Sequence, residues 1–160
     1  MNPPPALCLV LACGNTLRRD DGVGPWLAAW AAERFHANPS VRIVSRQQWT
    51  PELAEEIARA GAVVFIDCSV ESPPGVMRFA RIEPGRQTAA LTAHHLGAAE
   101  LLTLAKDLYG ATPRKALQLT IGAGSLEMGE KFSEAAQAAL PEACRLLEET
   151  LADLLAESVA

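Results

Sequence analysis

Residues 6–24 read ALCLVLAC-GNTLRRDDGVG and decide the fold of this 160-residue chain. The first part, Ala6 to Cys13, is an apolar run between a proline and a glycine, which is typical of a buried β-strand. Apolar residues then recur at helical spacing, namely Val23, Trp26, Leu27, Trp30 and Ala31. A glycine-rich, charged loop thus joins a strand to a helix, and this loop is the first candidate for a functional site.

Two adjacent carboxylates, Asp20 and Asp21, fall in this loop where the N-cap and first turn of the helix are expected, and Pro25 suits that first turn. The positive end of the helix dipole favours their ionised forms. Ordinary helix capping is an alternative role for one of them. The loop contains neither Gly-x-Gly-x-x-Gly nor Gly-x-x-x-x-Gly-Lys-Ser/Thr, and two aspartates would repel a phosphate. A cation, or a substrate that carries one, fits better.

Composition and charge limit the class of protein. With 49% hydrophobic and 21% charged residues the chain is globular, and its length predicts one domain over residues 1–160. A net charge of -5 and few aromatic residues argue against a nucleic-acid-binding protein. The four cysteines have neither Cys-x-x-Cys nor zinc spacings, so packing in a reducing compartment is expected. The N-terminal apolar run is too short for a signal peptide or a membrane span, which predicts a cytoplasmic protein without membrane contact.

The rest of the chain alternates between predicted strands and helices. Strands are expected at residues 41–44, 62–67, 76–82 and 117–122, and helices at 51–59, at 98–109 and toward the C-terminus. Thr50 and Thr92 are N-cap candidates, and Thr92 would place His94 and His95 in the first turn of a helix. Pro141 either begins the C-terminal helix or interrupts one that starts near Ser133.

This alternation predicts a three-layer α/β/α architecture. Right-handed crossovers place the first strand between the second and the third. The strand at 76–82 should run antiparallel to the third strand, because the connection between them is too short for a helical crossover. The carboxyl ends of the first and third strands then share a crevice, on which Asp20, Asp21 and Asp67 converge.

An imidazole is the expected third donor at this crevice. A helix N-terminus disfavours the imidazolium form and leaves a neutral nitrogen of His94 or His95 available to a metal. Two carboxylates and one imidazole suit nickel, zinc, manganese or iron(II). Water could complete such a shell in a hydrolytic centre, or the metal could arrive already held by a partner.

Other chemistries need only side chains. A close pair among Asp20, Asp21 and Asp67 would raise one pKa and allow acid–base catalysis. Cys13 and Cys68 also lie near the crevice, but packing is the favoured role for both. No Gly-x-Ser-x-Gly motif indicates a serine nucleophile.

An ordered set of motifs runs through the chain. It consists of Gly14-Asn15-x-Leu17-x-x-Asp20-Asp21-Gly22-x-Gly24, Asp67 at a strand end before Pro74-Gly75, His94-x-Leu96-Gly97 with Glu100-Leu101-Leu102, the segment Gly122 to Ser125, and Leu140-Pro141-Glu142. In this order the motifs resemble the maturation endopeptidases of nickel–iron hydrogenases. The resemblance covers essentially the whole chain.

The resemblance implies a phosphorylase/hydrolase-like fold with a five-stranded mixed sheet of order 2-1-3-5-4, in which strand four is antiparallel. It also implies an aspartyl-type endopeptidase that removes the C-terminal extension of a [NiFe] hydrogenase large-subunit precursor after nickel insertion. Nickel belongs to this substrate, the protein's partner, and signals that the precursor is ready. The metal-contacting residues of the family match Asp21, Asp67 and His94 here, and Asp21 and Asp67 are the candidate catalytic groups.

Several points stay open at this stage. The family often has Gln where this chain has His95, so either histidine could be the ligand, and the Leu-Gly that follows favours His94. Nickel is expected to polarise the scissile carbonyl or a water, assisted by Asp21 or Asp67. The alternatives are a non-catalytic nickel-binding or relay module on the same crevice and an unrelated metallohydrolase with its own ion. The protein is expected to act as a monomer.

Overall fold

A single mixed sheet organises the computed structural model, which describes residues 6–85 and 96–159. Its strands are β1 (Cys8–Cys13), β2 (Val41–Arg46), β3 (Ala62–Ser69), β4 (Met77–Arg81) and β5 (Lys115–Gly122). Their order is β2-β1-β3-β5-β4, and only β4 runs antiparallel to its neighbour. The predicted order and the predicted direction of the fourth strand are both confirmed.

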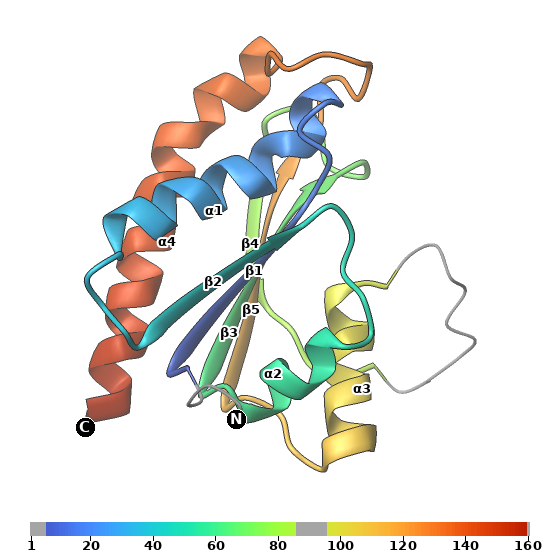
Figure 1. Cartoon of the computed structure of the whole chain (residues 1–160). Helices are drawn as coiled ribbons and strands as arrows, with labels where there is room; N and C mark the ends of the chain where they lie inside the picture. Colours follow the sequence, from blue (N-terminus) through green and yellow to red (C-terminus); the bar gives the residue numbers. More distant parts are fainter. Residues whose placement is uncertain (1–5, 86–95, 160) are drawn as a thin grey trace.

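Helices cover both faces of the sheet (Figure 1). They are α1 (Val23–Arg34), α2 (Leu53–Arg59), α3 (Ala98–Tyr109) and α4 (Glu134–Val159), with a short 3₁₀ helix η1 (Arg19–Gly22) before α1. Side chains alternate along each strand, so Val64 packs toward α1 and α4 while Phe65 packs toward α2 and α3. The three-layer architecture is confirmed. No helix among the described residues is long and apolar enough to cross a membrane.

The central and edge strands differ in burial as expected. Residues 62–66 of β3 are completely buried, as in a parallel strand covered on both faces. Most of β4 is exposed at the sheet edge. Strand β3 continues to Ser69, two residues beyond its predicted end. Asp67 is therefore still paired with β5 and is not the last residue of the strand.

One predicted helix start is wrong. The helix predicted from residue 51 begins at Leu53, and the N-cap position is Glu52, without a side-chain cap from Thr50. Helix α3 spans Ala98–Tyr109, which confirms the predicted helix at 98–109, and Gly97, with extended backbone, occupies the N-cap position. The predicted cap Thr92, together with His94 and His95, lies outside the described residues.

The C-terminal helix is continuous through Pro141. It begins after Ser133, whose hydroxyl accepts the N–H of Ala136 at 3.2 Å, so Ser133 caps the helix. Pro141 removes the hydrogen bond to the carbonyl of Gln137, but Gln137 is exposed and water can replace the lost donor. Of the two predicted alternatives, the helix that starts near Ser133 is the one present, although the proline does not end it.

Two glycines allow the loop after β1 to fold back against the sheet. Gly14 has φ of +150°, and a Cβ there would lie 1.8 Å from the carbonyl oxygen of Asp21. Gly24 brings the start of α1 against β1 and β3, because a Cβ would lie 2.6 Å from the carbonyl oxygen of Cys13 and 3.1 Å from that of Ile66. These approaches hold η1 directly over the carboxyl ends of the central strands.

Candidate active site

A cleft of about 600 Å³ lies where β1, β2 and β3 end. The loop after β1 contributes Asp21, the end of β3 contributes Asp67 and Cys68, and residues 47–51 follow β2 along another side. Leu96 and Gly97, just before α3, complete the rim in the part of the chain that the structure describes. The predicted convergence of the two loops at the topological switch point is therefore present in the fold.

Asp21 is held by its own loop. Its Oδ2 accepts the backbone N–H of Asn15 at 2.7 Å, which closes the turn from residue 15 to residue 21. No other hydrogen bond to its carboxylate is found within residues 6–85 and 96–159. Asp21 is thus positioned by one contact, and much of its capacity to accept hydrogen bonds or bind a cation is unused by these residues.

Asp67 is held by the strand end and by a neighbouring thiol. Its Oδ1 accepts the backbone N–H of Cys68 at 2.7 Å. The thiol of Cys13, on the adjacent strand β1, also hydrogen-bonds to this carboxylate. Asp67 therefore faces the cleft from a rigid central strand, which is a favourable support for a functional group.

The two cysteines of the cleft stay protonated at neutral pH. Burial, followed by the charge and hydrogen bond of Asp67 and the charge of Asp21, raises the pKa of the Cys13 thiol far above its ordinary value. Burial, followed by the charges of Asp21 and Asp67, raises the pKa of Cys68 to about 12. A nucleophilic cysteine requires the opposite shift. Both carboxylates therefore raise the pKa of both thiols.

Asp20 has a structural role. Its side chain is completely buried and accepts four hydrogen bonds, from the N–H groups of Gly124, Ser125 and Ser133 and from the hydroxyl of Ser133. Burial alone would raise the pKa of Asp20, but the bonds from Ser133, Gly124 and Ser125 outweigh it and lower the pKa. Asp20 is therefore a permanent anion that joins the loop after β1 to the start of α4. The hypothesis of acid–base catalysis that includes Asp20 is wrong.

The predicted third donor, His94, and its alternative His95 lie outside the described residues. The remaining histidine, His36, follows the far end of α1 and bonds to the carbonyl of Glu33 at 2.8 Å. Within residues 6–85 and 96–159, no three His, Cys, Asp or Glu side chains are grouped so that they could hold a metal ion. The described part of the cleft thus provides two carboxylates.

Sequence reasoning missed several residues of the cleft. Strand β2 continues to Arg46, two residues past its predicted end, so Gln47 and Gln48 follow it directly into the cleft. Trp49 is buried beside them and packs edge-on against Phe65, with ring centroids 5.2 Å apart. The position of β2 next to β1 was the signal that residues after β2 would reach the same crevice.

Arg18 and Leu126 also line the cleft and are joined to each other. The Arg18 guanidinium donates to the carbonyl of Leu126 at 3.2 Å, and Arg18 forms an isolated bridge with Gly129. This contact spans more than a hundred residues of sequence, and no local pattern indicates it.

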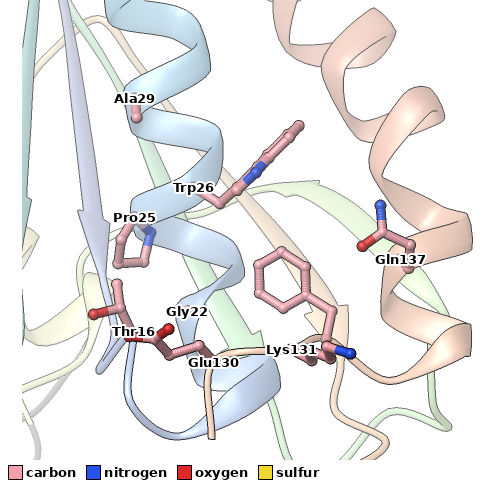
Figure 2. Close-up of a pocket in the computed structure, with 9 residues that line it drawn as sticks. Thr16, Gly22, Pro25, Trp26, Ala29, Glu130, Lys131 and Gln137 are labelled. Atoms are coloured by element: carbon pink, nitrogen blue, oxygen red, sulfur yellow. The ribbon is translucent and has the colours of Figure 1, made fainter.

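A second hollow lies on the other side of the same loop, between α1 and the start of α4 (Figure 2). Trp26 and Pro25 line it from α1, and Gln137 lines it from α4. Its described lining has a single carboxylate, Glu130, near Lys131. The paired carboxylates therefore distinguish the first cleft as the candidate active site.

Solved structures of hydrogenase maturation peptidases are similar to this chain. Neither protein-family models nor curated protein sequences match this chain. The hydrogenase 2 maturation peptidase from Thaumarchaeota archaeon SCGC_AB-539-E09 is similar, with a TM-score of 0.66 and 28% identity over 91% of this chain and 97% of that one.

Two further solved structures share the fold. The hydrogenase maturating endopeptidase HybD from E. coli has a TM-score of 0.72 and 22% identity, over 91% of this chain and 92% of that one. The [NiFe] hydrogenase maturation protease HybD from Thermococcus kodakarensis has a TM-score of 0.64 and 24% identity, over 89% and 97%. In fold and strand order the chain is thus similar to solved peptidases of hydrogenase maturation.

Proposed function

We propose that this protein removes the C-terminal extension of a [NiFe] hydrogenase large-subunit precursor and recognises the nickel that the precursor carries. The observation that supports this most is the presence of Asp21, from η1 after β1, and Asp67, from β3, in one cleft at the carboxyl edge of the sheet. Two carboxylates can bind a borderline cation such as nickel, provided that the client supplies further donors to the metal.

In this proposal nickel is part of the substrate. Asp21 and Asp67 contact the metal of the loaded precursor, and His94 is the proposed third contact. The metal brings the scissile peptide bond to the cleft and polarises its carbonyl or a water, while Asp21 or Asp67 assists proton transfer. A precursor without nickel lacks this attachment and is not positioned for cleavage.

The chemistry of the cysteines agrees with this assignment. With the pKa of Cys68 near 12 and that of Cys13 also raised, neither thiol forms the thiolate that a cysteine peptidase needs. The carboxylates are then the reactive groups that the described part of the cleft offers. Action in the cytoplasm, and action as a monomer, stay predictions.

Intact-mass measurement of the client tests the proposal. A nickel-loaded large-subunit precursor from the same cell is incubated with the protein, and nickel-free precursor is treated in parallel. Loss of a C-terminal peptide from the loaded form alone is the expected result. Unchanged mass in both forms, with folded protein, would contradict a peptidase role and favour the nickel-relay alternative.

The metal content of the purified protein gives a second readout. The proposal expects no tightly held nickel, because the metal belongs to the client. One tightly bound equivalent per chain would instead favour a resident metal, as in a relay module or an unrelated metallohydrolase.

A further inference from the structure

Three residues form a row across the carboxyl half of the sheet. In the strand pairing, Asp67 of β3 lies opposite Thr120 of β5, and Thr120 lies opposite Arg78 of β4. Paired residues of adjacent strands point to the same face, and Phe65, two residues before Asp67, identifies it as the face covered by α2 and α3. A carboxylate, a hydroxyl and a guanidinium are thus aligned on three neighbouring strands.

This row forms part of a hollow of about 700 Å³ that opens from the candidate active site. The hollow and the cleft share Asp67, Cys68 and Val70. Asp21 lines the cleft and is absent from the lining of the hollow. Asp67 therefore lies between two adjacent spaces, one lined by Asp21 and the other by Arg78.

Three polar side chains of the hollow, those of Thr120, Gln118 and Arg78, have no hydrogen-bond or ion-pair partner in the part of the chain that the structure describes. Thr120 and Gln118 are half-buried, and their side chains form no hydrogen bond there. Arg78 forms no ion pair or hydrogen bond among these residues, and the segment 86–95 contains no acidic residue. By contrast Arg81, on the same strand, pairs with Glu83 at 3.4 Å.

We infer that this hollow binds the part of the client's C-terminal extension that follows the scissile bond, and that Arg78 pairs with a carboxylate of that extension. The inference rests on the proposed function. If nickel contacts Asp21 and Asp67, the metal-bearing part of the client occupies the cleft, and the chain beyond the scissile bond continues past Asp67 into the hollow. Thr120 and Gln118 there offer donors and acceptors to its peptide groups.

The charges in and around the two spaces explain why the ligand of Arg78 should be acidic. Three carboxylates line the two spaces, those of Asp21, Asp67 and the exposed Glu71; Arg18 lines the cleft, Arg78 lines the hollow, and the whole chain has a net charge of -5. An acidic peptide would be repelled unless a cation received it. A guanidinium binds a carboxylate through two parallel hydrogen bonds and is the group best suited to this role.

Charge reversal at Arg78 tests the inference. Cleavage of the nickel-loaded precursor is measured for the unchanged protein, for Arg78→Glu and for the matched control Arg81→Glu, which makes the same charge change on the other face of β4. We expect kcat/KM to fall about tenfold or more for Arg78→Glu, mainly through KM, and to stay within about threefold for Arg81→Glu. Equal rates for both variants would overturn the subsite.

Changes in the client identify the carboxylate. One precursor has the acidic side chains of its extension replaced by amides, and another has its extension lengthened by a few glycines and serines to move the terminal carboxylate. A loss of cleavage with the first assigns the ligand to a side chain, and a loss with the second assigns it to the chain end. A precursor with lysine at the assigned position should be cut faster by Arg78→Glu than by the unchanged protein.

These outcomes separate the subsite from the proposed function. If the unchanged protein cuts the precursor while none of the changes at Arg78 or in the extension affects KM, the peptidase role stands and the subsite is wrong. If the unchanged protein does not cut the loaded precursor, the proposed function fails and the subsite fails with it.

Discussion

Two neighbouring aspartates occupy opposite environments in this protein. Asp20 is completely buried and accepts four hydrogen bonds from the loop at 124–125 and from Ser133. Asp21 accepts one, from Asn15, and lines the cleft. The short helix η1 turns one side chain inward and the next outward, so a single loop both joins distant parts of the fold and supplies a site residue.

The difference separates stability from function along one chain segment. The carboxylate with saturated hydrogen bonds can do little chemistry, since its charge is already neutralised by donors. The carboxylate of Asp21, with one hydrogen bond, can still accept further hydrogen bonds or bind a cation. Isosteric replacement of each aspartate by asparagine should therefore give opposite results.

The largest effect is expected for Asp21→Asn and Asp67→Asn. Loss of a carboxylate that contacts nickel or transfers a proton should slow precursor cleavage by about a thousandfold. The free energy of unfolding should change by no more than about 1 kcal/mol for Asp21→Asn, because only one hydrogen bond is affected. Intact-mass kinetics and urea titration measure the two quantities.

If Asp21→Asn cleaved the precursor at the full rate, Asp21 would have no role in cleavage. Retention of full cleavage by both Asp21→Asn and His94→Ala would contradict the whole assignment of metal contacts. The parallel variant Asp20→Asn controls for the loss of a negative charge from this loop.

The next largest effect is expected for Asp20→Asn, and it should appear in the free energy of unfolding. An asparagine keeps one acceptor but places an amide group against backbone donors, which leaves buried N–H groups unpaired. The free energy of unfolding should fall by about 3 kcal/mol. Urea denaturation followed by circular dichroism tests this, and a loss no larger than that of Asp21→Asn would show that the buried bonds contribute little.

The place of β1 between β2 and β3, and the general position of the site, follow from apolar patterns and crossover handedness, whereas the places of β4 and β5 are implied by the family resemblance. Apolar runs mark β1 and β3, and the handedness of the crossovers then places β1 beside β3. Asp21 lies in the segment that follows β1, and Asp67 lies near the carboxyl end of β3. Their meeting in one cleft is a consequence of topology alone.

Other features depend on contacts between distant segments. The local sequence pattern does not separate Asp20 from Asp21, because the rotation of η1 is fixed by bonds to Ser133 and Gly124, more than a hundred residues away. The choice of Asp21 comes from the family resemblance. The row from Asp67 to Arg78 depends on the register of β4 against β5, which no periodicity specifies. The start of the second helix, predicted at residue 51, lies at Leu53 because Thr50 does not cap it.

Acidification provides a smaller and more specific test of Asp20. Its pKa is lowered in the folded protein, whereas the unfolded chain protonates near the ordinary value of about 3.9. Its stabilising contribution is therefore complete above about pH 4 and is lost as the pH falls toward the folded-state pKa. The difference in unfolding free energy between the unchanged protein and Asp20→Asn should shrink below about pH 4. A difference that is constant from neutral pH to acid would contradict the lowered pKa.

The smallest effect is expected at the cysteines of the cleft. With its pKa raised to about 12, the Cys68 thiol should react slowly with iodoacetamide at neutral pH, because little thiolate is present. Cys68→Ala should cleave the precursor within about threefold of the unchanged protein, since the alanine keeps the backbone N–H that Asp67 accepts. Cys13→Ser should behave alike, because a hydroxyl can still donate to Asp67. A large loss in Cys68→Ala alone would mean that the thiol itself contacts the client, and the division between reactive carboxylates and inert thiols would then have to be abandoned.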